Sequence, residues 1–431
     1  MKVGIDLGTT YSAVARYDKT SNKTLMIPNA FGKEITPSVI CFLDDGDILV
    51  GEDAKDMQSN GTGVNAAAFK RNMGDGSIAV SFNGKDYTSE DLSAMLLKHL
   101  IQDAEKSLGE KITEVVITVP AYFNDFQRTA TIRAGESCGV KVSKIINEPT
   151  AAAIAHGMTE QNDSRYLVFD LGGGTFDVSI LELYQPIMEV HAIAGDNFIG
   201  GEDFTDVLYD LFLQSTGIAP ETLDLNTRSE IRKNAENCKC AFSHSSEVIM
   251  CCTIHGQMHI LRLTLEEYER ACAPLLDRLR KPIERSLRDA GVSLQEIDQI
   301  VLVGGATRSP VVRKFVSKLF GRIPCFGVNP DEAVAIGAAL QCGIKSRDKE
   351  IQEIVLTDVC PFTLGTEVMM DNGVFEEPGH YLPIIERNTV IPVSRTETLY
   401  TAHENQTRIT VKILQGESRM SQNNLLLGEL S

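Results

Sequence analysis

Short apolar runs alternate with longer amphipathic stretches along most of the chain. The short runs are rich in Val and Ile and end near Gly or Pro, which is typical of buried strands. Three examples are Val115–Val119, Tyr166–Phe169 and Ile300–Val303. The amphipathic stretches repeat apolar residues with the period of a helix. Three examples are Ser89–Leu108, Thr264–Ala290 and Pro310–Leu319. Strands that alternate with helices predict an α/β fold with mixed sheets covered on both faces.

The pattern changes after Lys349. A short apolar run, Ile354-Val355-Leu356, has acidic residues on both sides and would by itself be one more core strand. Beyond Pro361 the apolar and polar residues alternate in short segments separated by turn residues, which predicts β-structure. These segments are Thr389–Val393, Glu397–Thr401 and Arg408–Leu414.

The length and composition narrow the class of protein. The chain has 431 residues, enough for two or three domains of roughly 150 residues each. Its 43% hydrophobic and 23% charged content excludes a disordered or collagen-like chain. The 41 Lys and Arg residues against 59 Asp and Glu residues leave a net charge of −18, which repels phosphate backbones. We therefore expect no nonspecific nucleic-acid binding.

The N-terminus and the cysteines indicate the compartment. The N-terminal sequence MKVGIDLGTTYS has no apolar core of a secretion signal, and no apolar run approaches the roughly 18 residues of a membrane helix. We expect a cytoplasmic protein without membrane contact, and its 10 cysteines are then reduced thiols. The clusters Cys238-x-Cys240 and Cys251-Cys252 lack the CxxC spacing of zinc sites, so we expect buried thiols there.

Two segments recur in the same order in the two halves of the chain. Val3–Thr10, with the sequence VGIDLGTT, is similar to Leu167–Thr175, with the sequence LVFDLGGGT. Asn147–Ala155, NEPTAAAIA, is similar to Asn329–Gly337, NPDEAVAIG. Two ordered matches predict two related lobes, and the cleft between two lobes is where small ligands usually bind.

Each first repeat runs from an apolar strand into Asp-Leu-Gly and then Gly or Thr. Gly lets backbone N–H groups approach anionic oxygens and Thr donates hydrogen bonds, so two such hairpins could clamp a polyphosphate, although each alone could be a tight turn. Asp6, Asp170 and Asp177 would repel phosphate unless a hard cation intervenes, and Mg²⁺ is the natural candidate. The GxxxxGK[ST] P-loop is absent, so nucleotide chemistry would be of another kind.

Seven motifs carry a family resemblance that runs almost from end to end. They are GIDLGTTYS, VITVPAYFND, INEPTAAAIAHG, FDLGGGTFD, IGGEDF, VLVGGATRSP and NPDEAVAIGAAL. Together they resemble the DnaK-type heat-shock chaperones, the Hsp70 family of the actin/hexokinase/heat-shock ATPase superfamily. The resemblance implies a two-lobed actin-like ATPase with a duplicated ribonuclease H-like core. Glu189–Phe198 and Val355–Cys360 look most like a shorter, divergent bacterial branch called HscC.

The resemblance assigns roles at the phosphate end of bound ATP or ADP. Catalytic roles fall on Lys70, Glu148, Asp170 and Thr175. The two phosphate loops would contain Gly8, Thr9, Thr10 and Tyr11, and Gly172, Gly173 and Gly174. Mg²⁺ would be held, largely through its waters, by Asp6, Asp170 and Asp177. Phosphoryl transfer needs mainly positioning and charge neutralisation, which this set supplies. Without the family, the pair Lys70-Arg71 would be interpreted as a solvated face.

The resemblance places residues of both lobes around the nucleoside. One group is Gly304, Gly305, Arg308 and Asp331. The other group is Gly200, Gly201, Glu236, Lys239 and Ser243. The spacing of Glu236, Lys239 and Ser243 predicts that they share one face of a helix. The family commonly stacks an Arg on adenine where this chain has Cys240, so we expect weaker nucleotide affinity and faster exchange.

The resemblance also divides the chain into domains. Residues 1–350 would form the ATPase domain, 351–357 the interdomain linker, and 358–431 the N-terminal part of a peptide-binding β-sandwich. Ile409 falls at the family's central peptide pocket, and the loop Asp371–His380 is longer than the family pattern. A sandwich cut short would leave an edge strand unpaired near residues 425–430.

A relay between the ATP site and the domain interface is implied as well. Pro120 and Arg128 match the family's relay, although without the family they would be a strand-terminating Pro and a surface Arg. We therefore expect an ATP-dependent chaperone in which ATP hydrolysis controls, through the linker, the binding and release of unfolded or extended polypeptide. Implied partners are a J-domain co-chaperone and possibly a nucleotide exchange factor, and the implied context is the stress response.

Two other classes of function stay open at this point. One is an actin-like or sugar-kinase-like ATPase without a peptide client, and the other is a nucleotide-binding module without turnover. The fold alone does not choose between these classes. The linker and the β-rich segment favour the chaperone.

Overall fold

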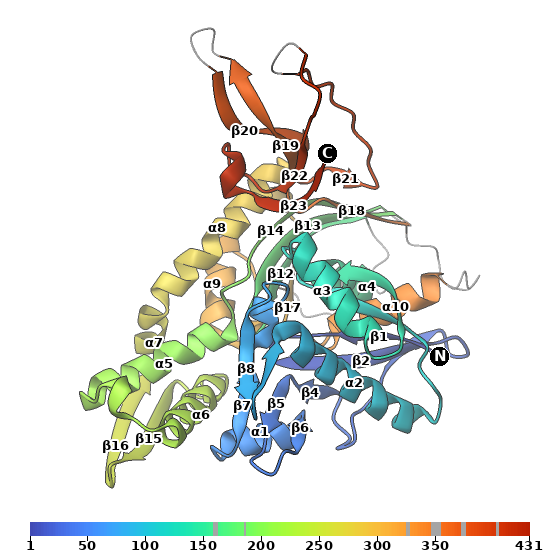
Figure 1. The fold of residues 1–431 in the computed structure, drawn as a ribbon. Coiled ribbons are helices and arrows are strands. Elements are labelled where there is room, and N and C mark those ends of the chain that lie inside the picture. Colours follow the sequence, from blue (N-terminus) through green and yellow to red (C-terminus); the bar gives the residue numbers. More distant parts are fainter. Residues whose placement is uncertain (158–162, 185–186, 325–327, 346–354, 372–375, 402–404) are drawn as a thin grey trace.

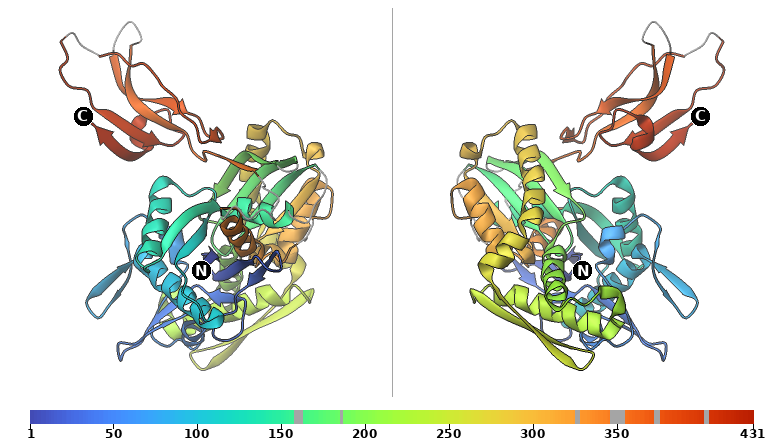
Figure 2. Two further views of the ribbon diagram at one scale, coloured as in Figure 1. Left: turned by 90° about the vertical axis from the view of Figure 1, so that its right-hand side faces the viewer. Right: turned by 90° about the vertical axis from the view of Figure 1, so that its left-hand side faces the viewer.

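The computed structural model describes residues 1–157, 163–184, 187–324, 328–345, 355–371, 376–401 and 405–431. Figure 1 shows two α/β lobes and a β-rich C-terminal part, and Figure 2 shows the same arrangement from two further sides. In the described ranges, no helix combines the length and the apolar character that a bilayer crossing requires.

The sheet of the first lobe has the strand order β11-β10-β1-β2-β3, with β4 paired to β2. Its strands are β1 (Lys2–Asp6), β2 (Tyr11–Asp18), β3 (Lys23–Met26), β4 (Ile35–Pro37), β10 (Glu114–Val119) and β11 (Lys141–Asn147). β1 is parallel to β10 and antiparallel to β2. One face packs on α2 (Ser89–Leu108) and α3 (Asp125–Glu136). The other packs on α4 (Glu148–Gly157) and α10 (Ala333–Lys345).

The second lobe repeats this plan. Its sheet has the order β17-β12-β13-β14-β18-β21, and β12 is parallel to β17 and antiparallel to β13, as β1 is to β10 and β2. The strands are β12 (Ser164–Leu171), β13 (Phe176–Tyr184), β14 (Ile187–Asp196), β17 (Gln299–Val303), β18 (Val355–Val359) and β21 (Val390–Ile391). The predicted internal repeat and two-lobed α/β fold are therefore confirmed.

The second pair of repeats forms the contact between the lobes. The helices α4 and α10 come from the two repeats and pack against each other between the sheets. A Cβ atom on Gly337 would collide with the Ala151 carbonyl, so this glycine permits the close approach of the helices.

Smaller elements extend each lobe. In the first lobe they are β5 (Val39–Phe42), β6 (Ile48–Val50), β7 (Val64–Ala67), β8 (Ile78–Phe82), β9 (Lys85–Thr88) and α1 (Glu52–Ser59). In the second lobe they are α5 (Gly201–Thr216), α6 (Leu225–Ala241), β15 (Glu247–Ile254), β16 (Gln257–Thr264), α7 (Leu265–Ala271), α8 (Ala273–Ala290) and α9 (Pro310–Phe320). The helices α1 and α6, one from each lobe, contact each other.

The C-terminal part is a four-stranded sheet beyond the second lobe (Figure 1). Its order is β20-β19-β22-β23, with β19 (Leu364–Asp371), β20 (Glu376–Ile385), β22 (Val411–Gln415) and β23 (Leu425–Leu430). Among the described residues β23 is an edge strand, as expected. β18 joins this part to the second lobe, because it pairs in parallel with β14 and antiparallel with β21.

Several predicted elements have different bounds. Thr264–Ala290 is two helices rather than one, because Pro274 has no N–H to donate to the preceding turn and starts α8 as a new helix. Glu397–Thr401 is not a strand, because no described strand pairs with it. The prediction of a long loop over Asp371–His380 is partly wrong, because β20 already begins at Glu376. Residues 372–375 of this predicted loop lie outside the described ranges.

Candidate functional site

The two predicted phosphate loops lie against each other where the two lobes meet. A Cβ atom on Gly173 would collide with the Thr10 hydroxyl, and one on Gly174 would lie 2.6 Å from Thr9 Cγ2. Only glycine fits at these two positions. The buried Thr10 Oγ1 has no hydrogen-bond partner within the described ranges, so it is free to donate to an anionic ligand.

Hydroxyl groups hold the first loop in its bend. Ser12 Oγ accepts a hydrogen bond of 3.2 Å from the Gly8 N–H, and Ser38 Oγ donates one of 2.8 Å to the Gly8 carbonyl. The two serine hydroxyls are 3.0 Å apart and buried. The loop is therefore fixed before any ligand binds, which suits a phosphate site.

Lys70 lies next to the first loop, because its Nζ contacts the Leu7 carbonyl. It belongs to the short 3₁₀ turn Phe69–Asn72 and its side chain is only 3% exposed. Its Nζ donates to Glu148 Oε1 over 2.6 Å and also to the Leu7 carbonyl. Glu148 is the first residue of α4. The structure thus brings together the lysine and the glutamate to which the resemblance gives catalytic roles.

Three aspartates lie at the ends of the central strands near this pair. Thr118 Oγ1 donates to Asp6 over 3.1 Å, and Asp177 accepts hydrogen bonds from the backbone N–H groups of Ala121 and Tyr122. Asp170 is paired with Asp177 across β12 and β13. Its buried Oδ2 has no hydrogen-bond partner in the described part of the chain.

Burial makes these carboxylates unusually basic. Burial, followed by the charge of Glu148, raises the pKa of Asp6 and the pKa of Asp177 to about 7. The same two causes raise the pKa of Asp170 well above its usual range. Lys70 acts in the opposite direction on all three. Carboxylates that are crowded and desolvated in this way need a further positive charge when they ionise.

The donor set fits a cation that keeps its waters. Among the described residues, no three His, Cys, Asp or Glu side chains are close enough together to hold a metal directly. Mg²⁺ commonly binds to carboxylates through its waters, and the unpartnered Asp170 Oδ2 offers an acceptor for one.

One side of the predicted nucleoside site is formed after β17. Arg308 Nη2 is 2.5 Å from Asp331 Oδ2 and donates to Asn329 Oδ1 over 2.8 Å. Gly304 has a φ of +82°, and a Cβ atom on it would collide with the Leu171 carbonyl. This glycine therefore lets the turn after β17 pack on the start of the second phosphate loop. Gly305 is close to the same ion pair, because a Cβ atom on it would lie 3.0 Å from Asp331 Oδ1.

The other side is formed by α5 and α6. Lys239 Nζ donates to the Gly201 carbonyl over 2.9 Å and pairs with Glu236 Oε2 at 2.7 Å. The Gly201 N–H donates to the Gly172 carbonyl over 2.9 Å, which holds residues 200 and 201 against the second phosphate loop. The structure thus brings Gly172 together with Gly200, Gly201, Glu236 and Lys239.

Ser243 and Cys240 lie near the C-terminal end of α6. The predicted helical face is wrong for Ser243, because α6 ends at Ala241 and Ser243 follows in a turn where its N–H bonds the Cys240 carbonyl. Cys240 is exposed, with its Sγ 3.6 Å from Glu236 Oε1.

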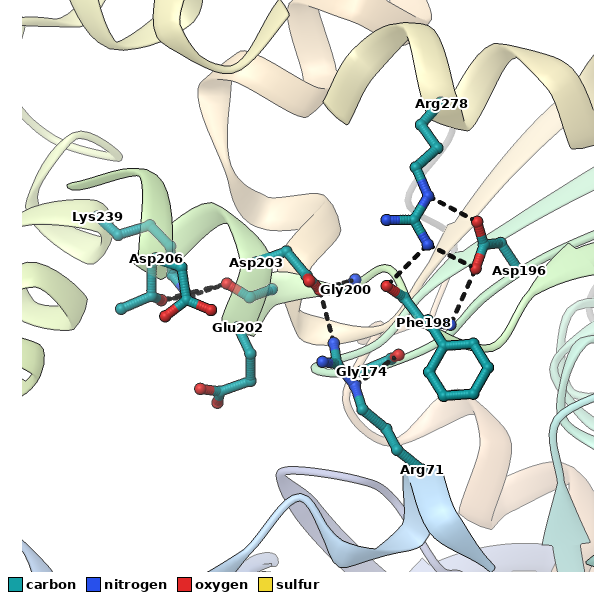
Figure 3. A network of polar contacts seen from close by, with 12 residues as sticks. Arg71, Gly174, Asp196, Phe198, Gly200, Glu202, Asp203, Asp206, Lys239 and Arg278 are labelled. Atoms are coloured by element: carbon teal, nitrogen blue, oxygen red, sulfur yellow. Dashed lines mark hydrogen bonds and ion pairs between the residues drawn. The ribbon is translucent and has the colours of Figure 1, made fainter. Parts of the chain in front are cut away.

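Arg71 forms a contact between the two lobes that the sequence interpretation missed. Its Nε donates to the Gly174 carbonyl over 3.0 Å and its Nη2 to Asp203 Oδ2 over 2.6 Å, while Asp203 also accepts from the Gly200 N–H (Figure 3). Arg71 comes from the first lobe and its partners from the second, so this ion pair ties the lobes together. The motif IGGEDF, which contains Asp203, was the available signal.

The predicted relay residue Arg128 is half-buried rather than fully exposed. Its guanidinium donates to the Ala121 and Phe123 carbonyls and, over 2.8 Å, to Asn147 Oδ1. Burial lowers the pKa of Arg128 from its ordinary value. Asn147 in turn donates to Asp358 on β18 over 2.9 Å. The segment after Pro120 is therefore connected to β18, the strand that begins within the predicted linker.

The backbone of the predicted linker is described only from Val355. There it forms the start of β18, with Val355, Leu356 and Thr357 in register with residues 187–189 of β14. Residues 351–354 lie outside the described ranges. The described end of the linker is thus an added strand of the second-lobe sheet.

Two duplicated lobes that close on facing hairpin loops define an actin-like ATPase fold. The sequence profile of the Hsp70 protein family matches residues 2–77 and 69–431. A "Chaperone protein DnaK" from Thermosipho africanus is 43% identical over 439 residues, covering 99% of this chain and 72% of that protein. A protein of the same name from Thermosipho melanesiensis is 42% identical over the same coverage.

The chain belongs to the Hsp70 family. It is accordingly an ATP-dependent molecular chaperone with ATPase activity, as the motifs predicted. The matched relatives are DnaK proteins, and they do not single out the HscC branch.

Proposed function

We propose that this chain hydrolyses ATP in the cleft between its lobes and that Lys70 and Glu148 are the central catalytic pair. The observation that carries this proposal is the buried contact of 2.6 Å between Lys70 Nζ and Glu148 Oε1 beside the two phosphate loops. The short contact with Glu148 and the burial of Lys70 hold its ammonium group in one place. Little reorganisation is therefore needed when charge develops on a transferred phosphoryl group.

The remaining residues have complementary tasks in this proposal. The backbone of Gly8–Tyr11 and Gly172–Gly174 and the hydroxyls of Thr10 and Thr175 donate hydrogen bonds to the phosphates. Glu148 positions the attacking water, and its own charge is offset by Lys70. Mg²⁺, held through water by Asp6, Asp170 and Asp177, would supply the charge that neutralises the β- and γ-phosphates.

The nucleoside would lie between the turn at Gly304–Arg308 and the face of α6 that carries Glu236 and Lys239. Support comes from the contacts that bring both segments to the second phosphate loop. Ser243 is kept in this proposal as a residue of the turn after α6. Cys240 presents a small thiol on this side, so the base is held without a stacking cation.

We also propose the domain division 1–350, 351–357 and 358–431. Consistent with it, α10 ends at Lys345 and the four-stranded sheet follows β18. In this proposal the sheet binds extended apolar polypeptide near Ile409, which is 53% exposed, and the apolar residues Leu399 and Tyr400 are exposed as well. The nucleotide controls peptide binding by changing how β18 docks on β14.

The proposed setting follows from the family. We infer a cytoplasmic chaperone of the stress response that works with a J-domain co-chaperone and possibly a nucleotide exchange factor. Assignment to the HscC branch is part of this proposal and rests on the segments Glu189–Phe198 and Val355–Cys360.

The test is the rate of ATP hydrolysis by the full-length protein with and without an extended apolar peptide. Stimulation by the peptide supports the coupled chaperone. Normal basal turnover without stimulation would reject the coupling, and ATP binding without turnover would reject the catalytic assignment as well.

A further inference from the structure

Tyr122 contacts three separate parts of the molecule. Its backbone N–H donates to Asp177 Oδ1 over 3.1 Å, in the proposed phosphate and cation site. Its ring centroid lies 4.5 Å from that of Phe362, just after β18. Its hydroxyl accepts a hydrogen bond of 2.8 Å from Arg285 Nη1. A shift of the backbone beside Asp177 therefore also moves the ring and the hydroxyl.

Arg285 extends this connection along α8. Its guanidinium carbon lies 5.8 Å from the centroid of the Tyr122 ring, and its Nε is 3.9 Å from Asp289 Oδ2, one turn further along the helix. The Arg285 side chain is 32% exposed and that of Asp289 is 10% exposed, so both are shielded from water on most sides. A charged contact in such surroundings is screened less than one on the open surface.

Asp289, on α8, contacts two residues of the C-terminal part. Its Oδ1 accepts from Arg387 Nη2 over 2.8 Å and its Oδ2 from Asn388 Nδ2 over 3.2 Å. Asn388 also accepts a hydrogen bond of 3.2 Å from the Ile193 N–H on β14. The carboxylate of Asp289 is therefore shared between Arg285, on the ATPase side, and two residues of the C-terminal part.

We propose that Arg285 is a positioning residue that links the nucleotide site to the docking of the C-terminal part. It holds the Tyr122 hydroxyl and, through the same guanidinium, orients the Asp289 carboxylate toward Arg387 and Asn388. When the charge beside Asp177 changes, Tyr122 shifts, and Arg285 transmits the shift to Asp289. This inference rests on the proposed coupling between nucleotide and docking.

Linkage makes the effect reciprocal. If Arg285 favours docking more in the ATP state than in the ADP state, docking must favour ATP over ADP by the same factor. If Arg285 merely stabilised the fold, replacing it would lower the melting temperature in both nucleotide states. The ratio of ATP to ADP affinity would then stay unchanged.

The experiment uses the full-length protein and a small set of variants. These are Arg285→Gln, Arg285→Lys, Tyr122→Phe, the double variant of Arg285→Gln with Tyr122→Phe, and Arg280→Gln as a control on the same helix, where Arg280 is exposed. Docking is measured as hydrogen exchange of the amides of residues 355–359 with ATP and with ADP, and the affinities of both nucleotides are measured alongside.

The wild type should show slower exchange with ATP than with ADP. Arg285→Gln should reduce this difference, and the ATP/ADP affinity ratio, at least about fivefold. The double variant should have the same ATP/ADP affinity ratio as Arg285→Gln alone, because both changes remove the same contact between Arg285 and the Tyr122 hydroxyl. Arg280→Gln should match the wild type. Arg285→Lys should restore part of the difference.

An unchanged ratio in Arg285→Gln, or strictly additive effects in the double variant, would overturn the role of Arg285 while leaving the proposed function intact. A wild type with equal exchange in ATP and ADP would instead reject the proposed coupling, and with it the role given to Arg285.

Discussion

Lys70 Nζ and Glu148 Oε1 are 2.6 Å apart, although the two residues are separated by 78 positions in the chain, and both side chains are nearly fully buried. A buried ammonium group is retained only where its charge is matched, and here it is matched by Glu148 beside the two proposed phosphate loops. The pair therefore indicates where the transferred phosphoryl group would lie.

Replacing Lys70 by Ala should abolish ATP hydrolysis but leave ATP binding within a few fold. The loops provide most of the phosphate contacts, whereas the ammonium group stabilises the charge that develops in the transition state, an effect on the order of 10²–10³-fold in rate or more. Single-turnover cleavage and equilibrium binding measure the two quantities, and a melting curve checks folding. Cleavage within a few fold of the wild type would remove Lys70 from the mechanism.

Opening the ion pair between the lobes should accelerate nucleotide release. Asp203→Asn removes the charge that Arg71 contacts over 2.6 Å, so the closed cleft loses a bond of about 1 kcal/mol, and ADP should dissociate roughly 5-fold faster. Stopped-flow release of labelled ADP measures this rate. Glu269→Gln, which breaks the exposed pair with Lys314, is the matched control and should have no effect. Equal rates in the two variants would mean that Arg71 does not hold the cleft closed.

Placing an arginine at position 240 should slow the release of ADP. In Cys240→Arg, an arginine beside Glu236 can stack on adenine, which is worth roughly 1 kcal/mol, and most of the change should appear in the dissociation rate. Labelled ADP in a stopped-flow instrument again gives the rate. Unchanged or faster release would show that the base does not lie against this position.

The buried aspartates should make stability depend on pH. Asp177 has an ordinary pKa of 3.8 and a folded pKa of about 7, so the folded chain binds the proton more tightly than the unfolded chain. The stability from this proton is fully present below about 3.8 and is lost as the pH rises through about 7. Asp177→Asn should therefore gain stability relative to the wild type over that window.

Chemical denaturation of the ligand-free protein at several pH values between 4 and 8 measures this difference. Glu110→Gln, at an exposed position, is the control and should show no trend. A constant difference between Asp177→Asn and the wild type across the window would mean that Asp177 ionises normally in the fold.

Local signals in the sequence predicted local structure well. The helix Ser89–Leu108 has the predicted bounds because Thr88 and Asp91 form a capping box at its start and Gly109 adopts a left-handed conformation after its end. Ser243 shows the limit of such reasoning, because its spacing fits a helix that ends two residues earlier.

Contacts between distant segments could not be predicted from the local sequence. The sequence around Arg71 contains nothing that indicates Gly174 or Asp203, which lie on the other lobe. Arg128 would be assigned to the surface by itself, yet it is half-buried and bonded to Asn147 at the end of β11. Glu397–Thr401 alternates like a strand, but no described strand lies beside it to supply the hydrogen bonds.

Coupling between the nucleotide site and β18 is tested most directly by the affinity of the full-length protein for ATP relative to ADP. The variant carries Val355→Asp and Leu356→Asp in β18, where two charged residues disfavour the strand that pairs with β14. Its control carries Ile249→Asp and Met258→Asp, at two exposed strand positions of the β15–β16 hairpin. We predict an ATP/ADP affinity ratio at least about fivefold below the wild type in the linker variant, with no peptide stimulation and unchanged melting of the ATPase domain. An unchanged ratio with intact folding would show that residues 355 and 356 are only a tether and would contradict the coupling.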